Sequence, residues 1–303
     1  MIKGILISSL VPMENHIANG GEKLLGNASS IKRRPDGKVY ISGQMQRHSL
    51  FSAIERLNNA DANKGNTFVS NGDGVSMQIE NDLRADMGGF LDPGIGDYSG
   101  RRIAPLSVTP AVALDESQIG RDMLLQLKTL DREHNIATKE FSQSDIMHMN
   151  FFMDVASLGI SKAYFYDDNK HIETSYIKHT TESERKRRTK LYVEATRSLT
   201  DYANQARNAV SGEPQKVVIV FDTRLSRKAA RYFTASEQEQ KNIIKEILDR
   251  DAVYFLGDDT TDRSVNQAYK DALKYLEENS LYDPSCKRDD EIKTFEEFRN
   301  SLG

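Results

Sequence analysis

The chain has 303 residues, of which 38% are hydrophobic and 28% charged, and its formal net charge is −4. This composition is globular, and it excludes a disordered chain. No stretch approaches the roughly 18 apolar residues of a membrane span, residues 2–10 do not form a signal peptide, and the single cysteine, Cys286, excludes an internal disulfide. We therefore expect a cytoplasmic protein without membrane association.

The first part of the chain predicts a strand, a loop and a helix. Residues 2–10 form an apolar run typical of a buried strand, and a loop rich in Gly, Asn and Ser follows over residues 13–30. A turn signal at residues 35–37 precedes a short strand at residues 38–41. An apolar stripe at helical spacing then predicts a helix over residues 43–58, with Ser42 as its N-cap.

The rest of the chain combines an irregular insertion with further strands and helices. Residues 58–100 are rich in Gly, Asn and Asp, which predicts an insertion of short elements and loops. Beyond it we expect strands at 106–114 and 150–155, a hairpin that starts at 164–166, a long helix over 182–211, a strand at 216–221, and helices over 236–250 and 265–278. Pro110 indicates an edge strand or a bulge.

Without its insertions, this order is strand, helix, strands, helix, strand. The predicted fold class is therefore α+β, with a ferredoxin-like or modified RNA-recognition-motif core. The ordinary RNA-recognition motif stacks bases on aromatic residues of its sheet. We find no good match to its sequence pattern, so any RNA binding is expected from loops, helix ends and the insertion.

Charge is unevenly distributed along the chain. A net charge of −4 alone counts against nucleic-acid binding, because phosphate contacts need Lys and Arg. The cations gather in residues 32–34, 101–102, 185–188 and 224–231, whereas acids dominate the C-terminal region. This distribution is compatible with one basic groove on an acidic body, and a solvated surface is the alternative for each cluster. The basic run 185–190 begins a predicted helix, where cations are unfavourable beside the positive end of the helix dipole. This indicates either that the run binds an external anion or that it lies on a solvated face of the helix.

Residues 36–51 are the most informative segment. They place Ser42, Gln44, Arg47 and His48 on the first turns of a helix. Free backbone N–H groups and the positive end of the helix dipole suit phosphate there, and Arg47 adds a charge-assisted contact. The alternative is a capped helix whose Arg47 lies in solvent.

This segment resembles the signature of the Cas-seven-type backbone subunit, the DevR family of type I CRISPR Cascade complexes, in which a strand leads through Ser-Gly-Gln-x-x-Arg into the first helix. Supporting features follow in family order over most of residues 1–235, among them Arg101-Arg102 before the strand at 106–114 and Asp222-Thr223-Arg224 after the strand at 216–221. The resemblance suggests subtype I-B.

The resemblance implies a hand-shaped protein that polymerises head to tail along CRISPR RNA and leaves the guide bases free to pair with target DNA. Its implied partners are the RNA, the target DNA strand, further copies of itself, and the repeat-handle-binding, large and small Cascade subunits. Its implied parts are a palm with thumb elements (residues 1–58 and 101–235), an inserted finger (residues 59–100), and a C-terminal helical region packed on the palm (residues 236–303).

Eleven residues are carried over as RNA-binding candidates. Those of the first helix should lie along the RNA backbone, the preceding basic loop should face the same groove, and the others lie where the insertion returns to the palm or where the thumb begins. They are Lys32, Arg33, Arg34, Ser42, Gln44, Arg47, His48, Arg101, Arg102, Arg224 and Arg227.

We expect no catalytic residue, metal or cofactor. The acidic run at residues 258–262 has no nearby His and no second acidic cluster with metal-ligand spacing. Related type III subunits cut RNA with an aspartate in the loop between the first strand and helix, where this chain has Asp36, but a Pro-Asp-Gly turn favours a structural role. The alternatives are a stand-alone single-stranded RNA-binding protein and a type III-like metal-dependent endoribonuclease.

Overall fold

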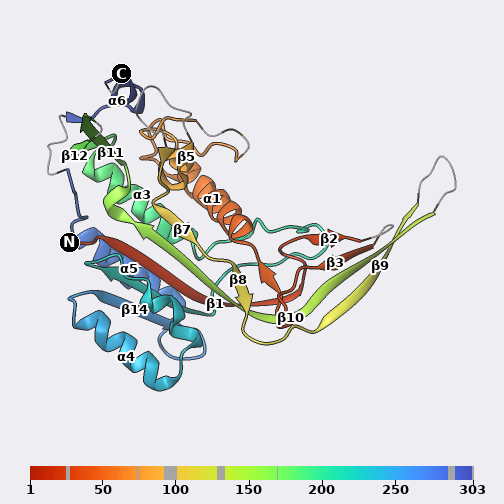
Figure 1. Ribbon diagram of the computed structural model, residues 1–303. Coiled ribbons are helices and arrows are strands. Elements are labelled where there is room, and N and C mark those ends of the chain that lie inside the picture. Colours follow the sequence, from red (N-terminus) through yellow and green to blue (C-terminus); the bar gives the residue numbers. More distant parts are fainter. Residues whose placement is uncertain are drawn as a thin grey trace.

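A computed structural model describes residues 1–24, 28–72, 74, 76–91, 101–127, 134–168, 170–285 and 291–301 (Figure 1). Cys286 lies outside these residues. The fold is a mixed α+β fold built on one large mixed sheet, so the predicted α+β class is confirmed. Across the described residues, no helix is both long and apolar enough to cross a bilayer.

The elements of the structure have the following bounds. The strands are β1 Gly4–His16, β2 Gly21–Lys23, β3 Ala28–Ile31, β4 Tyr40–Ile41, β5 Phe90–Leu91, β6 Arg101–Arg102, β7 Leu106–Val108, β8 Ala111–Ala113, β9 Ile119–Leu127, β10 His134–Asp154, β11 Ile160–Asp167, β12 Lys170–Lys178, β13 Lys216–Asp222 and β14 Val253–Asp258. The helices are α1 Gly43–Ala60, α2 Leu83–Gly88, α3 Glu182–Ala195, α4 Glu237–Leu248, α5 Val265–Glu278 and α6 Phe295–Asn300, with short 3₁₀ turns η1 Val155–Ser157 and η2 Lys228–Thr234.

Strand β1 lies at the centre of the sheet. It pairs antiparallel with β10 on one side and with β13 on the other, so that Ile7 lies opposite both Phe151 and Ile219. Strands β7 and β8 pair with the far edge of β10, and β14 pairs with β13. Beyond the sheet, β9 and β10 continue as a long two-stranded ribbon that extends away from the helices (Figure 1).

Both faces of β1 are covered, which explains why its sequence is a continuous apolar run. One core joins Ile5 and Ile7 to helices α1, α3 and α5. A second core, on the opposite face, joins Leu6 to η2 and α4. The apolar stripe predicted from residue 43 onward is the face that α1 buries, with Phe51 and Ile54 fully buried.

The predicted helix over residues 182–211 is wrong in its second half. Helix α3 ends at Ala195, and residues 196–212 form turns and irregular backbone. Leu199 and Tyr202, which suggested a longer helix, are buried in the main core, but the backbone around them is irregular. Asn204 has a positive φ of 61°, which interrupts helical geometry. Strands β9 and β14 and the first half of β10 were not predicted.

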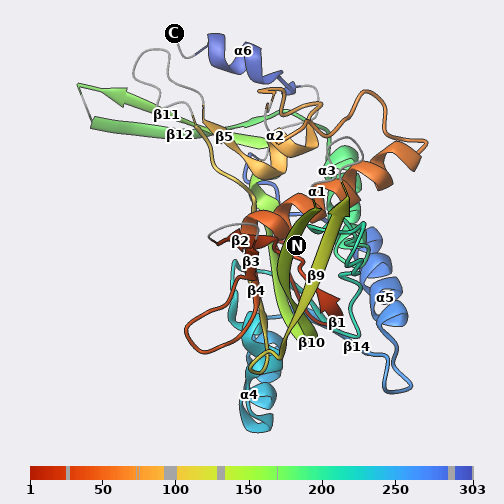
Figure 2. The same ribbon diagram turned by 90° about the vertical axis from the view of Figure 1, so that its right-hand side faces the viewer.

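A smaller part of the molecule lies above the sheet in Figure 2, where α2, β5, the β11–β12 hairpin and α6 lie together. Its core contains Ile79 from the insertion, Ala163 from β11, and Phe295 and Phe298 from α6. Helix α6 therefore packs on the insertion and the hairpin, whereas α4 and α5 pack on the sheet.

A buried ion network joins the insertion to the rest of the fold. Asp86 of α2 accepts from Arg188 of α3 (2.7 Å) and from Arg102 of β6 (2.6 Å), and its Oδ1 also accepts from the Gly159 N–H (2.9 Å). Burial raises the pKa of Asp86, but the charges of Arg188 and Arg102 outweigh it, so that its pKa lies below the ordinary value.

The basic run 185–190 is largely part of this internal structure. The guanidinium of Arg185 donates to Glu182 and to three backbone carbonyls, and that of Arg188 donates to Glu184 and Asp86. Both side chains are 0% exposed. The expectation that the run faces an external anion or solvent is therefore wrong for these two arginines.

Replacing Asp86 tests the importance of the network. Asp86→Asn leaves the buried Arg102 without its counter-charge and removes one of the two carboxylates that pair with Arg188, so we expect a loss of about 3–5 kcal/mol in the free energy of unfolding. Urea unfolding measures the loss, and Asp262→Asn, an exposed position, should stay within about 0.5 kcal/mol of the parent. Equal stability of the two variants would contradict this role for Asp86.

His179 connects the C-terminal segment to the hairpin. Its Nδ1 donates to the Lys293 carbonyl oxygen (2.7 Å), which leaves Nε2 to accept from Ser161 Oγ (2.9 Å). The ring also contacts Phe295 and Phe298. Burial lowers the pKa of His179 from its ordinary 6.5 to about 4, so the folded state holds the neutral imidazole.

Docking of α6 should therefore depend on pH. The contribution of His179 is fully present above pH 6.5 and is lost as the pH falls from about 6.5 toward 4, because the unfolded state binds the proton first. Hydrogen exchange, corrected for intrinsic rates, should show falling protection of residues 295–300 over that range, with α4 as internal control. Constant protection from pH 7 to 4 would be inconsistent with this assignment.

Candidate functional site

A groove of about 1140 Å³ lies between the N-terminus of α1, strand β7 and the insertion. Its walls come from five separate parts of the chain, which the fold brings together. The lining residues are Asn19, Lys32, Ser42, Gly43, Gln44, Met45, Arg47, His48, Asn71, Gly72, Arg84, Leu106, Ser107 and Val108.

The first turn of α1 opens into this groove. Ser42 caps the helix, since its Oγ accepts from the Met45 N–H (3.2 Å), and Asn19 Oδ1 accepts from the Ser42 N–H (2.9 Å). A Cβ on Gly43 would lie 3.2 Å from the Val108 carbonyl oxygen, so the glycine permits close approach of the helix to β7. The N–H groups of Gly43 and Gln44 and the positive end of the helix dipole therefore face an anion-compatible space.

The groove is positively charged. Lys32, Arg47 and Arg84 line it, and of the described residues that line it none is acidic. The guanidinium groups of Arg47 and Arg84 both lie over the ring of Phe51, at 5.6 and 4.6 Å from its centroid. Burial lowers the pKa of each, but an arginine remains charged at neutral pH.

Five of the eleven candidates line this groove, namely Lys32, Ser42, Gln44, Arg47 and His48. Gln44 and His48 are exposed, whereas Arg47 is half-buried and donates to the Gly88 carbonyl oxygen. Their predicted role as RNA contacts stays a prediction, but the structure does bring them to one surface.

The basic loop before α1 divides between the groove and the outer surface. Lys32 lines the groove, whereas Arg33 lies 3.8 Å from Glu140 and Arg34 lies 3.5 Å from Asp36. Both arginines are about half exposed, so these ion pairs contribute little and can be exchanged for another anion.

Arg102 requires a correction. Its side chain is 5% exposed, and it pairs with Asp86 and donates to the backbone carbonyls of Ser157 and Ile160. This burial contradicts the expected RNA contact, and we assign Arg102 a structural role. Arg101 lies in β6, but its side chain is outside what the structure describes.

The two candidates after β13 differ in their surroundings. Arg227 donates to Ser107 Oγ (3.0 Å) and lies over the Phe152 ring (4.5 Å), and Ser107 itself lines the groove. Arg227 therefore borders the groove at β7. Arg224 is exposed, and it is not among the residues that line the groove.

Sequence reasoning missed Asn19 and Arg84. Asn19 lies in a segment whose composition predicts only a loop, and Arg84 lies in an insertion without a recognisable motif. Both reach the groove through tertiary packing, so no local pattern could have identified them.

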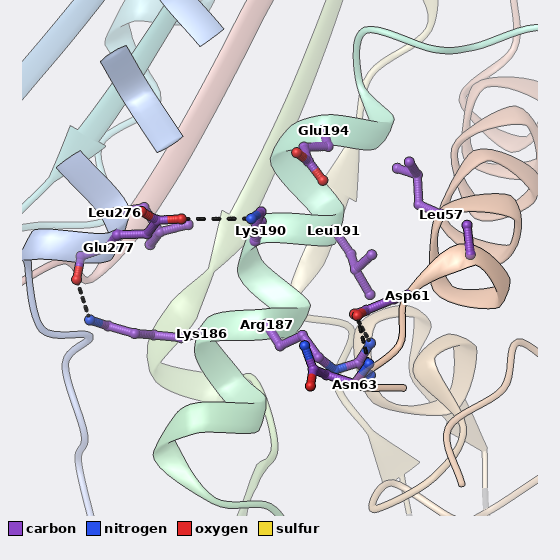
Figure 3. A pocket seen from close by; sticks show the side chains of 11 residues that line it. Leu57, Asp61, Asn63, Lys186, Arg187, Lys190, Leu191, Glu194, Leu276 and Glu277 are labelled. Atoms are coloured by element: carbon purple, nitrogen blue, oxygen red, sulfur yellow. Dashed lines mark hydrogen bonds and ion pairs between the residues drawn. The ribbon is translucent and has the colours of Figure 1, made fainter. Parts of the chain in front are cut away.

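A second pocket, of about 420 Å³, lies among α1, α3 and α5 (Figure 3). Its three cations each have a partner within the pocket: Arg187 pairs with Asp61 (2.9 Å), Lys190 pairs with Glu277 (3.6 Å), and Lys186 donates to the Glu277 carbonyl oxygen (3.0 Å). Since these charges are balanced, this pocket is a weaker candidate for an anionic ligand than the groove.

Asp36 lies away from the groove lining. It occupies an exposed turn, its Oδ1 accepts weakly from the Lys38 N–H (3.3 Å), and its carboxylate pairs with Arg34. Within the described part of the chain, no three His, Cys, Asp or Glu side chains gather where they could hold a metal ion.

No protein-family model and no curated protein matches this chain. The solved structures that share its fold include a chain titled "CRISPR RNA-guided surveillance complex" and one titled "CRISPR RNA-guided surveillance complex, pre-nicking". For each, the TM-score is 0.51 at 12% identity, over 99% of this chain and 100% of the other. At this identity the likeness shows a common fold.

The cap at the groove gives a stability prediction. Ser42→Ala removes the side-chain oxygen that accepts from Met45, and we expect a loss of about 1 kcal/mol in the free energy of unfolding, whereas Ser42→Asn should retain the cap. Urea unfolding of both variants measures the difference. If both variants lost the same stability, Ser42 would not act as a cap.

Proposed function

We propose that this chain is a non-catalytic, CRISPR RNA-binding backbone subunit of a type I Cascade surveillance complex. The carrying observation is the groove, in which the capped start of α1 and three cations face a space without a described acidic residue. The fold likeness to chains of CRISPR RNA-guided surveillance complexes supports the same role. The resemblance of the amino-acid sequence to the DevR family favours subtype I-B.

The proposed palm is ferredoxin-like. In support, the order β13-β1-β10-β7/β8 is antiparallel throughout, with α1 between β1 and β7 in the chain and α3 between β10 and β13. This is the arrangement of a βαββαβ unit in which the first and third strands are neighbours. The insertion that carries α2 would be the finger, which forms one wall of the groove.

The groove suits the RNA backbone better than its bases. Arginine and lysine, a hydroxyl group and helix N–H groups are donors, as phosphate oxygens require. A protein that holds the phosphates leaves the bases free, so sequence recognition passes to pairing with target DNA. Copies of the chain would stack head to tail along the RNA, with the other Cascade subunits at the ends and sides of the filament.

A non-catalytic role is part of the proposal. Asp36, which lies in the loop where type III subunits carry the aspartate that cuts RNA, occupies a Pro-Asp-Gly turn and pairs with Arg34. Incubation of the protein with complementary target RNA and Mg²⁺ should yield no product. Cleavage at regular spacing that disappears in Asp36→Ala would replace this proposal with the endoribonuclease alternative.

Arg47 should contribute directly to RNA binding. Arg47→Ala removes a charged donor from the groove, so we expect affinity for single-stranded RNA to fall about tenfold. The slope of log affinity against log salt should also become shallower by about 0.7, the value for one phosphate contact on a single strand. Fluorescence anisotropy at several salt concentrations measures both quantities.

Arg263→Ala is the matched control, since Arg263 is exposed and does not line the groove. It should leave both affinity and slope close to those of the parent. An unchanged slope in Arg47→Ala would remove Arg47 from the RNA contact.

Chain length of the RNA distinguishes a polymerising subunit from a stand-alone binding protein. On RNAs of increasing length, native mass spectrometry should find copies added in regular steps. A single copy on every length would favour the stand-alone alternative.

A further inference from the structure

Arg47 and Arg84 form an unusual pair of like charges. One belongs to α1 and the other to α2, and both guanidinium groups lie over the same ring of Phe51. Neither makes a described salt bridge within 4 Å to an acidic side chain, whereas fourteen other lysines and arginines form such pairs across the described residues. Two half-buried positive charges side by side repel each other.

The acidic residues near Arg84 do not neutralise it directly. Asp82 is fully buried, and its oxygens accept from the N–H groups of Ser70 and Arg84 and from Ser76 Oγ, so it caps α2. Glu55 is exposed on α1, one turn beyond Phe51. The charges of Asp82 and Glu55 raise the pKa of Arg84 and so partly offset its repulsion from Arg47, but among the described residues its guanidinium has no direct ion pair.

Unsatisfied donors occur at the same place. Arg84 Nε is buried and has no hydrogen-bond partner among the described residues, and the same is true of Asn19 Nδ2, further along the groove. Buried donors without partners are rare in folded proteins, because each costs the desolvation of a polar group. Both atoms are donors and both belong to groove-lining residues, so the missing partner is an acceptor.

We propose that Arg84 and Arg47 form a discrete phosphate subsite, at which one phosphodiester group lies between α1 and the insertion. The subsite deepens the proposed function, on which its biological role rests. A phosphate would supply the counter-charge for both guanidinium groups and an acceptor for Arg84 Nε. It would also join the finger to the palm, because the two arginines belong to different parts of the fold.

The subsite predicts an opposite effect of one substitution on stability and binding. Arg84→Gln removes the repulsion, so the phosphate-free protein should be as stable as the parent or more stable. A merely structural Arg84 would instead make that variant less stable. Arg84→Lys keeps the charge but lacks the planar fork and the Nε donor, so it should recover only part of the phosphate response.

The test is thermal unfolding of the full chain in inorganic phosphate and in chloride at equal ionic strength. Phosphate stabilises proteins generally through exclusion from their surface, so the relevant quantity is the excess over Arg84→Gln, with Arg263→Gln as the control for the loss of one positive charge elsewhere. The parent and Arg263→Gln should gain roughly 2 °C or more in Tm beyond the gain of Arg84→Gln. An equal gain in the parent and Arg84→Gln would overturn the subsite.

Binding of single-stranded RNA by the same proteins separates this proposal from the proposed function. Arg84→Gln should bind RNA about fivefold to tenfold more weakly than Arg263→Gln. If the parent binds RNA and Arg84→Gln binds equally well, the subsite is wrong and the function stands. If no variant binds RNA but the phosphate response depends on Arg84, the subsite stands and the function is wrong.

Discussion

The carboxylate of Asp86 accepts from two buried arginines that belong to distant parts of the chain, Arg102 and Arg188. This contact fixes the short helix α2 against α3 and β6. Two residues before Asp86, Arg84 faces the groove, and two residues after it, the Gly88 carbonyl accepts from Arg47. A Cβ on Gly88 would meet the end of the Arg47 side chain, so a larger residue there would displace the Arg47 guanidinium. The positions of Arg47 and Arg84 thus depend on a network whose own residues do not line the groove.

The network also explains why a cluster of Arg and Lys in the sequence does not by itself predict an RNA-binding surface. In the sequence, residues 101–102 and 185–188 look like the basic loop at 32–34. In the structure, Arg102, Arg185 and Arg188 are internal, because each finds a carboxylate or several carbonyl oxygens in the core. Only the tertiary structure distinguishes cations that stabilise the fold from cations that are available to a ligand. The local sequence does not show which acidic side chains or carbonyl oxygens will lie beside a given Lys or Arg.

Local sequence patterns predicted the part of the groove that the first turns of α1 form. The start of α1, its cap at Ser42 and the groove position of Gln44, Arg47 and His48 follow from a turn signal, a capping residue and an apolar stripe. The contributions of Asn19 and Arg84 could not be predicted, because they depend on where two loops pack. The helix at 182–211 was predicted too long for a related reason: Leu199 and Tyr202 are buried without being helical, and burial alone does not specify the backbone.

The central claim is that several copies of this chain assemble on one guide-length CRISPR RNA. The direct measurement is purification of the chain from cells that also express its neighbouring genes and a CRISPR array, followed by sequencing of the bound RNA and mass measurement of the assembly. We predict a large particle with several copies of the chain on RNA that contains spacer sequence. A monomer without RNA, or a mixture of unrelated RNAs, would contradict the claim.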